Sequence, residues 1–387
     1  MPRLTIGRIL GIPIRLDITF LLVLPVLAWL IGSEVGTWVE IITAMGVTLD
    51  GELLQAGVTP WILGTAAAIG LFAGVVAHEL GHSVVAMHYG YPIESITLWI
   101  FGGIAKLEEM PEHWSQELAV AVAGPIVSLA IAAIAFLLLP VVPVTGTVTA
   151  ALAFVLGYLA VMNVMLAVFN MLPGFPMDGG RVLRALLARR RPYAQATQIA
   201  ARVGKLFAIA LALLGLFGGN LFLVAIAFFI YLGAAGEAQL TVMKAAFEGV
   251  TVEDVMTPAD RIVTVSPEAT VAELVDRMFR ERHTGYPVVE NGRVLGIVTL
   301  DDARTVREVE REAFTVEEVM TTDLETIDPD ADAMSALTRL QSSRIGRLLV
   351  YEDGEFRGLI TRSDLMSAFE VIQSSGWTSP DLSVSRS

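Results

Sequence analysis

Two histidines and a glutamate lie in the middle of a stretch that is otherwise almost wholly apolar. Residues 70–90 read GLFAGVVAHELGHSVVAMHYG, with His78, Glu79 and His82 at the centre. Four residues turn an α-helix by about 400°, so His78 and His82 share one face, where two imidazoles can hold one metal ion. Glu79 lies on the adjoining strip, placed to take a proton from a water that such a metal activates. Charges inside an apolar span cost at least about 2.5 kcal/mol, so they need a compensating role.

A catalytic zinc usually takes three protein ligands, so this pattern requires one more. His88 projects off the metal face of the helix, and His113 lies in a polar loop. The stronger candidate is Asp178, within NMLPGFPMDGGR at residues 170–181. The two prolines of this segment cannot continue the preceding helix, which would let Asp178 point inward. The alternative is that Asp178 only caps the next helix.

Composition indicates a membrane protein with an acidic soluble part. Of the 387 residues, 54% are hydrophobic and 17% are charged, which is too apolar for a soluble protein. From residue 251 onward there are 26 acidic and 14 basic residues, a net charge of −12 out of −14 for the chain. This acidity argues against a nucleic-acid partner. Because the sequence has no cysteine, a metal must be held by histidine and carboxylate groups.

Apolar runs long enough to cross a membrane recur before residue 240. The expected spans are residues 18–31, 61–87, 118–139, 150–171 and 206–232. The last run has Gly218, Gly219 and Asn220 in its middle, so it is either one long tilted helix or a tight hairpin of two helices.

The charges of the loops predict the orientation. Residues 181–202 contain six arginines and belong in the cytoplasm, whereas residues 33–60 and 140–146 contain no lysine or arginine and belong outside. If the acidic tail is also cytoplasmic, the last apolar run crosses twice. We therefore expect six spans in the cell membrane, surrounded by lipid, with both termini and the tail in the cytoplasm. The metal would lie near the cytoplasmic face.

The segment between the second and third spans predicts β-structure. Residues 96–108 alternate apolar and polar side chains, carry β-branched residues and include a pair of glycines, which is typical of a strand or hairpin. Protein, and not lipid, must satisfy its backbone. Its edge could accept an unwound substrate segment as an added strand, with Phe101, Gly102 and Gly103 in contact with it.

Two motifs stand about a hundred residues apart: HELGH in one apolar helix and N-x-x-P-x-x-P-x-D-G. Together they resemble the site-2 protease family of intramembrane zinc metalloproteases. The resemblance implies that His78, His82 and Asp178 ligate zinc and that Glu79 is the general base. It also implies that Asn170 helps to hold the substrate or the developing oxyanion.

The soluble tail contains an internal repeat. TVEDVMT recurs as TVEEVMT, and NGRVLGIVTLDD is echoed by DGEFRGLITRSD. Each unit of about 60 residues is too short to bury a core alone and suits packing as a pair. The repeat resembles a tandem CBS module, a family that commonly binds adenine nucleotides such as ATP or AMP. The resemblance places Thr299, Asp302, Thr361 and Asp364 at the sugar- and phosphate-contacting positions. The alternative is that the pair only forms a homodimer.

These patterns predict an α-helical polytopic membrane protein with six transmembrane helices, a short membrane-associated β-hairpin and a soluble α/β tandem CBS module. The expected boundaries are a membrane domain at 1–240, a linker at 241–250, a CBS module at 251–373 with units at 251–306 and 315–371, and a disordered tail at 374–387.

The predicted function is zinc-dependent cleavage of the transmembrane segment of single-span membrane proteins, regulated by adenine nucleotide. Two other classes are a nucleotide-gated transporter and an inactive homologue that binds membrane proteins. A transporter would place ionisable groups on several spans, whereas here they gather at one site. The intact HELGH motif and Asp178 argue against an inactive homologue.

Overall fold

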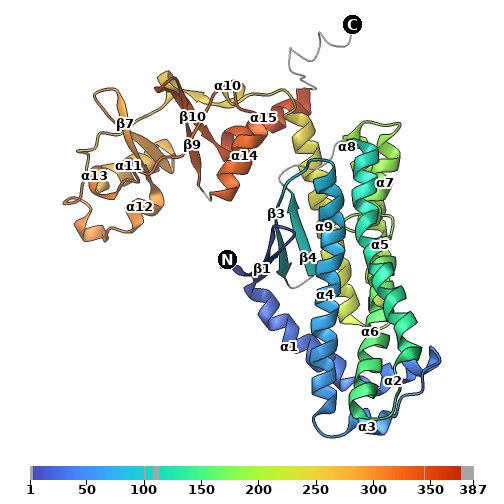
Figure 1. Ribbon diagram of the computed structural model, residues 1–387. Coiled ribbons are helices and arrows are strands. Elements are labelled where there is room, and N and C mark those ends of the chain that lie inside the picture. The colour runs from blue at the N-terminus through green and yellow to red at the C-terminus, as the bar shows by residue number, and fades with distance from the viewer. Residues whose placement is uncertain (1–2, 100–101, 108–112, 344, 376–387) are drawn as a thin grey trace. The chain divides into compact units, whose positions relative to one another are not determined.

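A computed structural model describes residues 3–99, 102–107, 113–343 and 345–375. The chain divides into two compact units, Met1–Gln239 and Leu240–Ser387 (Figure 1). Each unit contains buried apolar clusters of its own.

The first unit contains a four-stranded sheet with the strand order β1-β2-β3-β4. Its strands are β1 (Arg3–Ile9), β2 (Ile12–Asp17), β3 (Ile93–Trp99) and β4 (Gly102–Leu107). Strand β2 runs parallel to β3, and β4 is antiparallel to β3 at the edge of the sheet. The sequence analysis anticipated β3 and β4 but missed β1 and β2, which turn through Gly11 at φ 85°. Membrane association of the β3–β4 pair stays a prediction.

Three long helices form the centre of this unit: α4 (Thr59–His88), α5 (Trp114–Leu138) and α6 (Thr147–Asn170). Helix α5 packs against both of the others, and β3 and β4 lie against α4 (Figure 1). Gly81 of α4 lies so close to α5 that a Cβ there would be 2.9 Å from the carbonyl oxygen of Ala123. Small residues of this kind let helix backbones approach each other within a membrane.

Shorter helices surround this centre. Helix α1 (Ile18–Ser33) packs along α4, α2 (Val35–Ala44) and α3 (Gly51–Gln55) pack against α6, a 3-10 turn covers Leu139–Val141, and α7 (Asp178–Ala188) packs against α5. Within the described residues, five helices are long and apolar enough to cross a membrane, or six if α1 and α2, bent by 66°, form one span.

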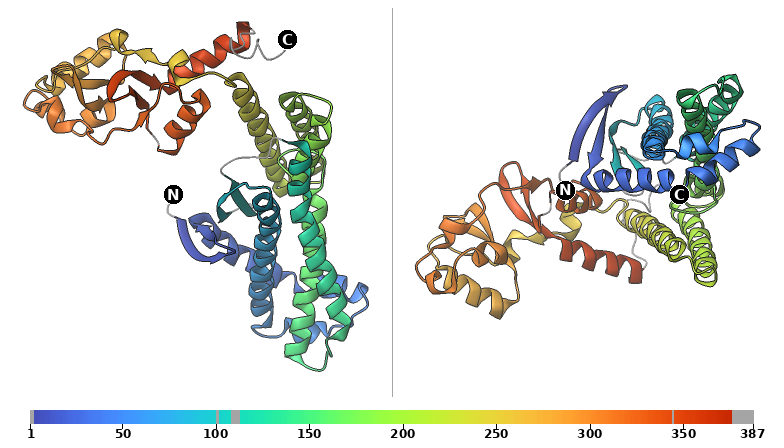
Figure 2. Two further views of the ribbon diagram at one scale, coloured as in Figure 1. Left: turned by 45° about the horizontal axis from the view of Figure 1, so that its top comes forward. Right: turned by 90° about the horizontal axis from the view of Figure 1, so that it is seen from below.

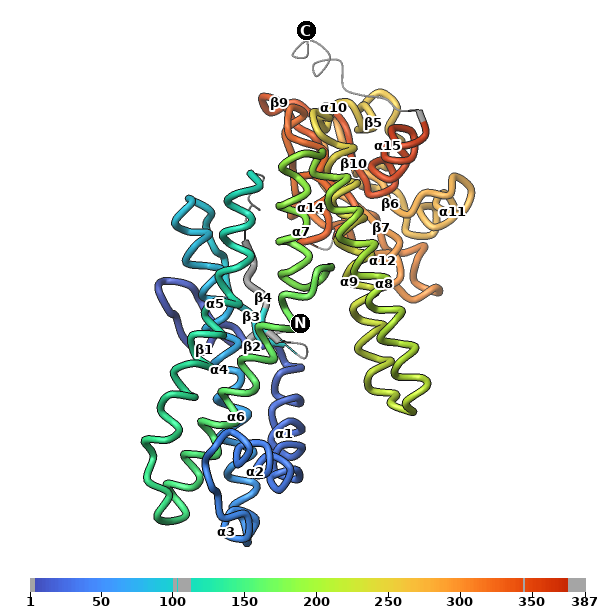
Figure 3. Tube along the Cα trace, turned by 90° about the vertical axis from the view of Figure 1, so that its right-hand side faces the viewer, coloured from blue at the N-terminus to red at the C-terminus, as the bar shows by residue number. Residues whose placement is uncertain are grey.

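The last apolar run is a hairpin of two helices, α8 (Tyr193–Phe217) and α9 (Leu221–Ala246), joined through Gly219 at φ 67° (Figure 3). The two-helix alternative of the sequence analysis is therefore confirmed. Helix α8 begins well before residue 206 because its first turns bury small residues, among them Ala196 and Ala200. Hydropathy does not detect that kind of packing.

The second unit consists of two repeats that lie side by side (Figure 2). The first contains α10 (Val252–Val255), β5 (Thr257–Pro258), a 3-10 turn (Ala259–Arg261), α11 (Val271–Glu281), β6 (Gly285–Glu290), β7 (Arg293–Thr299), α12 (Leu300–Arg304) and a 3-10 turn (Glu308–Glu310). The second contains α13 (Val316–Val319), β8 (Thr326–Ile327), α14 (Ala333–Ser342), β9 (Arg347–Glu352), β10 (Glu355–Thr361) and α15 (Arg362–Ser375).

The two repeats exchange their first segments. Strand β5 of the first repeat joins β10 of the second, in a sheet with the order β5-β10-β9-β8, while β6 and β7 form a two-stranded sheet. In return, Thr321 of the second repeat bridges to Ile297 on β7. Each repeat therefore completes the other, as its length predicted.

Candidate metal centre

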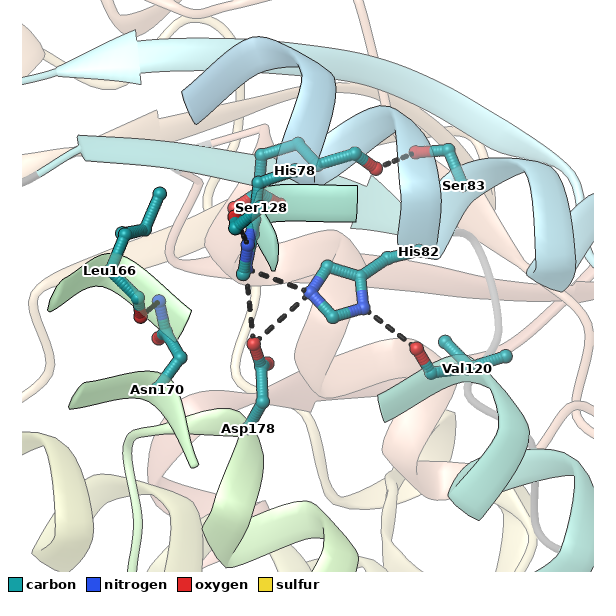
Figure 4. A network of polar contacts seen from close by, with 9 residues as sticks. His78, His82, Ser83, Val120, Ser128, Leu166, Asn170 and Asp178 are labelled. Carbon is teal, nitrogen blue, oxygen red and sulfur yellow. Dashed lines mark hydrogen bonds and ion pairs between the residues drawn. The ribbon is translucent and has the colours of Figure 1, made fainter. Parts of the chain in front are cut away.

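The side chains of His78, His82 and Asp178 converge on one buried point (Figure 4). The Oδ2 atom of Asp178 lies 3.1 Å from Nε2 of each histidine, and the two Nε2 atoms are 3.2 Å apart. Two ligands at about 2.0–2.1 Å from a tetrahedral zinc ion are separated by about 3.3 Å. The cluster therefore has the donor types and the spacing that a zinc site needs.

The other ring nitrogen of each histidine faces helix α5. His82 Nδ1 donates to the carbonyl oxygen of Val120 at 2.7 Å, and His78 Nδ1 lies 2.9 Å from Ser128 Oγ. Because a carbonyl only accepts, it fixes the proton of neutral His82 on Nδ1 and leaves the Nε2 lone pair towards the cluster. Helix α5 thus orients both imidazoles.

The loop before α7 aims Asp178 at the histidines. Two glycines in the first turn of α7 let this loop pack closely against the helix: a Cβ on Gly179 would lie 2.5 Å from the carbonyl oxygen of Met171, and one on Gly180 would lie 2.7 Å from that of Gly174. The N-cap position of α7 belongs to Met177, so the capping alternative is not realised.

Gly124 of helix α5 forms a wall of the cluster. A Cβ at this position would lie 2.7 Å from Nε2 of His78 and under 3.0 Å from Nε2 of His82. Because a metal must occupy the space in front of both Nε2 atoms, only the absence of a side chain at position 124 leaves room for it. Gly124 therefore has a specific role at the site that the sequence did not reveal.

Glu79 is half-buried under the edge strand of the sheet. A Cβ on Gly103 of β4 would lie 2.7 Å from Cγ of Glu79, so the strand crosses directly over this side chain. Gly102 begins β4, and Phe101 lies outside the described residues. Asn170 lies beside the cluster, with its Nδ2 donating to the carbonyl oxygen of Leu166 at 3.0 Å (Figure 4).

The two histidines rejected as ligands lie elsewhere. His88 packs on Tyr89 with ring centroids 5.6 Å apart, and His113 Nδ1 lies 2.8 Å from Ser115 Oγ. The structure thus brings together His78, His82 and Asp178, the three residues expected from the sequence to hold the metal.

A buried ion cluster that the sequence analysis missed fastens α7 to its neighbours. Arg184, 2% exposed, donates from Nε to Glu117 Oε1 at 2.6 Å and from Nη1 to Glu237 Oε1 at 2.9 Å. Its guanidinium also lies over the rings of Phe175 and Tyr193, at 4.8 and 4.7 Å. The cluster joins α7, which carries Asp178, to α5, which orients the histidines. Two features of the sequence could have indicated this cluster: Glu117 directly precedes an apolar span, and Arg184 follows Asp178 by six residues.

In the second unit the four predicted nucleotide residues line one cleft of about 940 Å³. Thr299 Oγ1 donates to Asp302 Oδ2 at 2.6 Å, and Thr361 Oγ1 donates to Asp364 Oδ2 at 2.7 Å. Both pairs are capping boxes of the helices that follow.

Comparison with known proteins agrees with this arrangement. Residues 66–154 and 141–211 match Peptidase family M50, and residues 252–308 and 316–371 match the CBS domain family. A zinc metalloprotease of Methanocaldococcus jannaschii is 32% identical over 95% of this chain and 96% of its own length. The Rip3 protein of Mycobacterium tuberculosis is 33% identical over 95% of this chain and 92% of its own length.

Among solved structures, the site-2 protease from Methanocaldococcus jannaschii is 34% identical to this chain. The match covers 61% of this chain and 95% of that one, with a TM-score of 0.42. Because a zinc metalloprotease is 32% identical over nearly the full length of both chains, and because both families match, we conclude that this chain is a multi-pass membrane metalloendopeptidase of the site-2 protease family, peptidase family M50, with a tandem pair of CBS domains.

Proposed function

We propose that this protein cleaves single-span membrane proteins inside their transmembrane segment, with His78, His82 and Asp178 holding one zinc ion per chain. The observation that carries the proposal is the convergence of these three donors at a buried point on two elements of the first unit. A bound zinc ion would polarise the scissile carbonyl and lower the pKa of a bound water, so that hydroxide is available as the nucleophile near neutral pH.

Glu79 is the general base of this proposal. It follows His78 on the same helix, next to the ligand face, and it is not needed as a ligand because three donors are already present. The carboxylate takes a proton from the attacking water and passes it to the leaving amine, so that the peptide C–N bond breaks and a carboxylate and an amine form. In this proposal Asn170, which lies beside the cluster, helps to hold the substrate or the developing oxyanion.

The edge of strand β4 is the proposed substrate surface. A helical substrate keeps its carbonyls in hydrogen bonds, so the segment to be cut has to unwind. An unwound segment can add to β4 as a further strand, which places its backbone next to Glu79, because Gly103 crosses over that side chain. Glycine at this position allows the close approach.

The asymmetry of arginine in the loops supports a cytoplasmic location for both termini and for the CBS pair. In this orientation the cut falls near the cytoplasmic end of the substrate's span. The CBS pair binds an adenine nucleotide in its 940 Å³ cleft and regulates proteolysis, and the homodimer stays a further prediction for the same pair.

The proposal is tested by reconstituting the purified protein in liposomes with single-span proteins from the same genome. We expect a zinc-dependent cut, located by mass spectrometry inside the apolar span and abolished by a zinc chelator. A cut confined to a soluble loop would contradict the intramembrane reading. Nucleotide regulation is checked by adding ATP or AMP to the same assay, where an unchanged rate would contradict it.

A further inference from the structure

The cleft of the CBS pair consists of two half-sites. Because β5 pairs with β10 and Thr321 bridges to Ile297 on β7, each half-site combines the Thr–Asp pair of one repeat with the first segment of the other. The first half-site contains Thr299, Asp302 and residues 321–325, and the second half-site contains Thr361, Asp364 and residues 257–263.

The two half-sites differ in charge. Within residues 321–325, the charged side chains that line the first half-site are those of Asp323 and Glu325. Within residues 257–263, the charged side chain that lines the second half-site is that of Arg261. Glu325 is paired with Arg339 at 3.0 Å, which offsets part of the negative charge. Within the described residues Arg261 has no ion-pair partner. These first segments therefore disfavour a phosphate group in the first half-site and favour one in the second.

The residues next to the Thr–Asp pairs increase this difference. The repeats align so that Leu300 and Asp301 in the first half-site stand where Arg362 and Ser363 stand in the second. All four line the cleft. The guanidinium of Arg362 donates to the carbonyl oxygen of Leu340 at 2.8 Å, which holds a positive charge at the second half-site.

One side chain also fills the first half-site. Arg347 and Gly285 are the first residues of β9 and β6, equivalent positions of the two repeats. Arg347 Nη2 donates to Thr284 Oγ1 at 3.1 Å, and a Cβ on Gly285 would lie 2.7 Å from this nitrogen. The carbonyl oxygen of Thr284 accepts from Leu300 N at 2.9 Å, so the contact with Thr284 places the guanidinium of Arg347 in the first half-site. The equivalent position in the first repeat is Gly285, which has no side chain to fill the second half-site.

Resting on the proposed nucleotide binding, we infer that the CBS pair takes one adenine nucleotide per chain and takes it in the second half-site. The ribose hydroxyls meet Asp364, and the phosphates lie by Thr361 and Arg261. The first half-site stays free of nucleotide because Arg347 occupies its space. The positive charge of Arg347 is offset by Asp302, so that Asp301, Asp323 and Glu325 still disfavour phosphate there.

The chain offers a matched pair of variants for the test, Asp364→Ala and Asp302→Ala. Each removes an Asp Oδ2 that accepts from a Thr N at 2.8 Å and from the same Thr Oγ1. Both variants lose the same helix cap, so a difference between them reports binding and not folding. Titration calorimetry of the full-length protein in detergent should give one ATP per chain. Asp364→Ala should lower the affinity for ATP by about tenfold or more, and Asp302→Ala should lower it by less than about threefold.

Arg261→Glu separates phosphate recognition from recognition of the nucleoside. This variant should lower the affinity for ATP by about tenfold and leave the affinity for adenosine nearly unchanged. Two ATP per chain, equal losses in the two aspartate variants, or a loss confined to Asp302→Ala would overturn the inference while leaving nucleotide binding intact. Failure of the unmodified protein to bind ATP, AMP and adenosine would overturn both this inference and the nucleotide part of the proposed function.

Discussion

Gly124→Ala should weaken zinc binding although position 124 ligates nothing. The new methyl group would lie 2.7 Å from Nε2 of His78 and closer still to Nε2 of His82, whereas ordinary contacts begin at 3.4 Å, so the rings or helix α5 must move by at least about 0.7 Å. Zinc–ligand distances tolerate changes of about 0.2 Å. Overpacking of this kind costs about 1–3 kcal/mol, which corresponds to a loss of about 5- to 150-fold in zinc affinity.

The assay is zinc competition with a chromophoric chelator, together with the zinc content of the purified protein by mass spectrometry. Gly236→Ala is the matched control, because among the described residues nothing lies within 4 Å of a Cβ at that position. The control should bind zinc as the unmodified protein does. Unchanged zinc affinity in Gly124→Ala would refute the reasoning that the missing side chain makes room for the metal.

Three further predictions follow from the site and the loops. His82→Ala should lose most of the zinc, because two donors hold it weakly, whereas His88→Ala should keep about one zinc per chain; equal zinc contents would mean that the ligands lie elsewhere. Arg184→Met removes the partner of the buried Glu117 carboxylate and an ion pair of the partly exposed Glu237, and should lower stability by about 3–5 kcal/mol, visible as a lower Tm. An unchanged Tm would show that the ion cluster does not fasten α7. A reporter fused after Phe247 should be cytoplasmic and one inserted within residues 33–60 external; a cytoplasmic signal from the second would reverse the topology.

The sequence predicted those parts of the site that depend on spacing along one element. His78 and His82 share a face because they are four residues apart, and the prolines and glycines around Asp178 indicated a turned chain. The repeat likewise indicated the CBS pair, because its two copies align residue by residue over their second halves.

The parts that the sequence missed depend on contacts between elements. Val120 acts through its backbone carbonyl, which any residue would offer, and Gly124 acts through a side chain that it lacks. In the sequence, Arg184 was only one of six arginines in a loop. Its partners Glu117 and Glu237 lie 67 and 53 residues away in the chain. Long-range pairings of this kind leave no periodic signal in one sequence.

The central claim is that this site hydrolyses peptide bonds with Glu79 as the base, and Glu79→Gln tests it most directly. Glutamine keeps the shape and the hydrogen-bonding reach but cannot take the proton. The variant should retain about one zinc per chain and cleave a single-span substrate in liposomes about 10²- to 10⁴-fold more slowly. Glu52→Gln, at an exposed glutamate of α3, should cleave at the normal rate. A zinc-loaded Glu79→Gln protein that cleaves as fast as the unmodified protein would contradict the account.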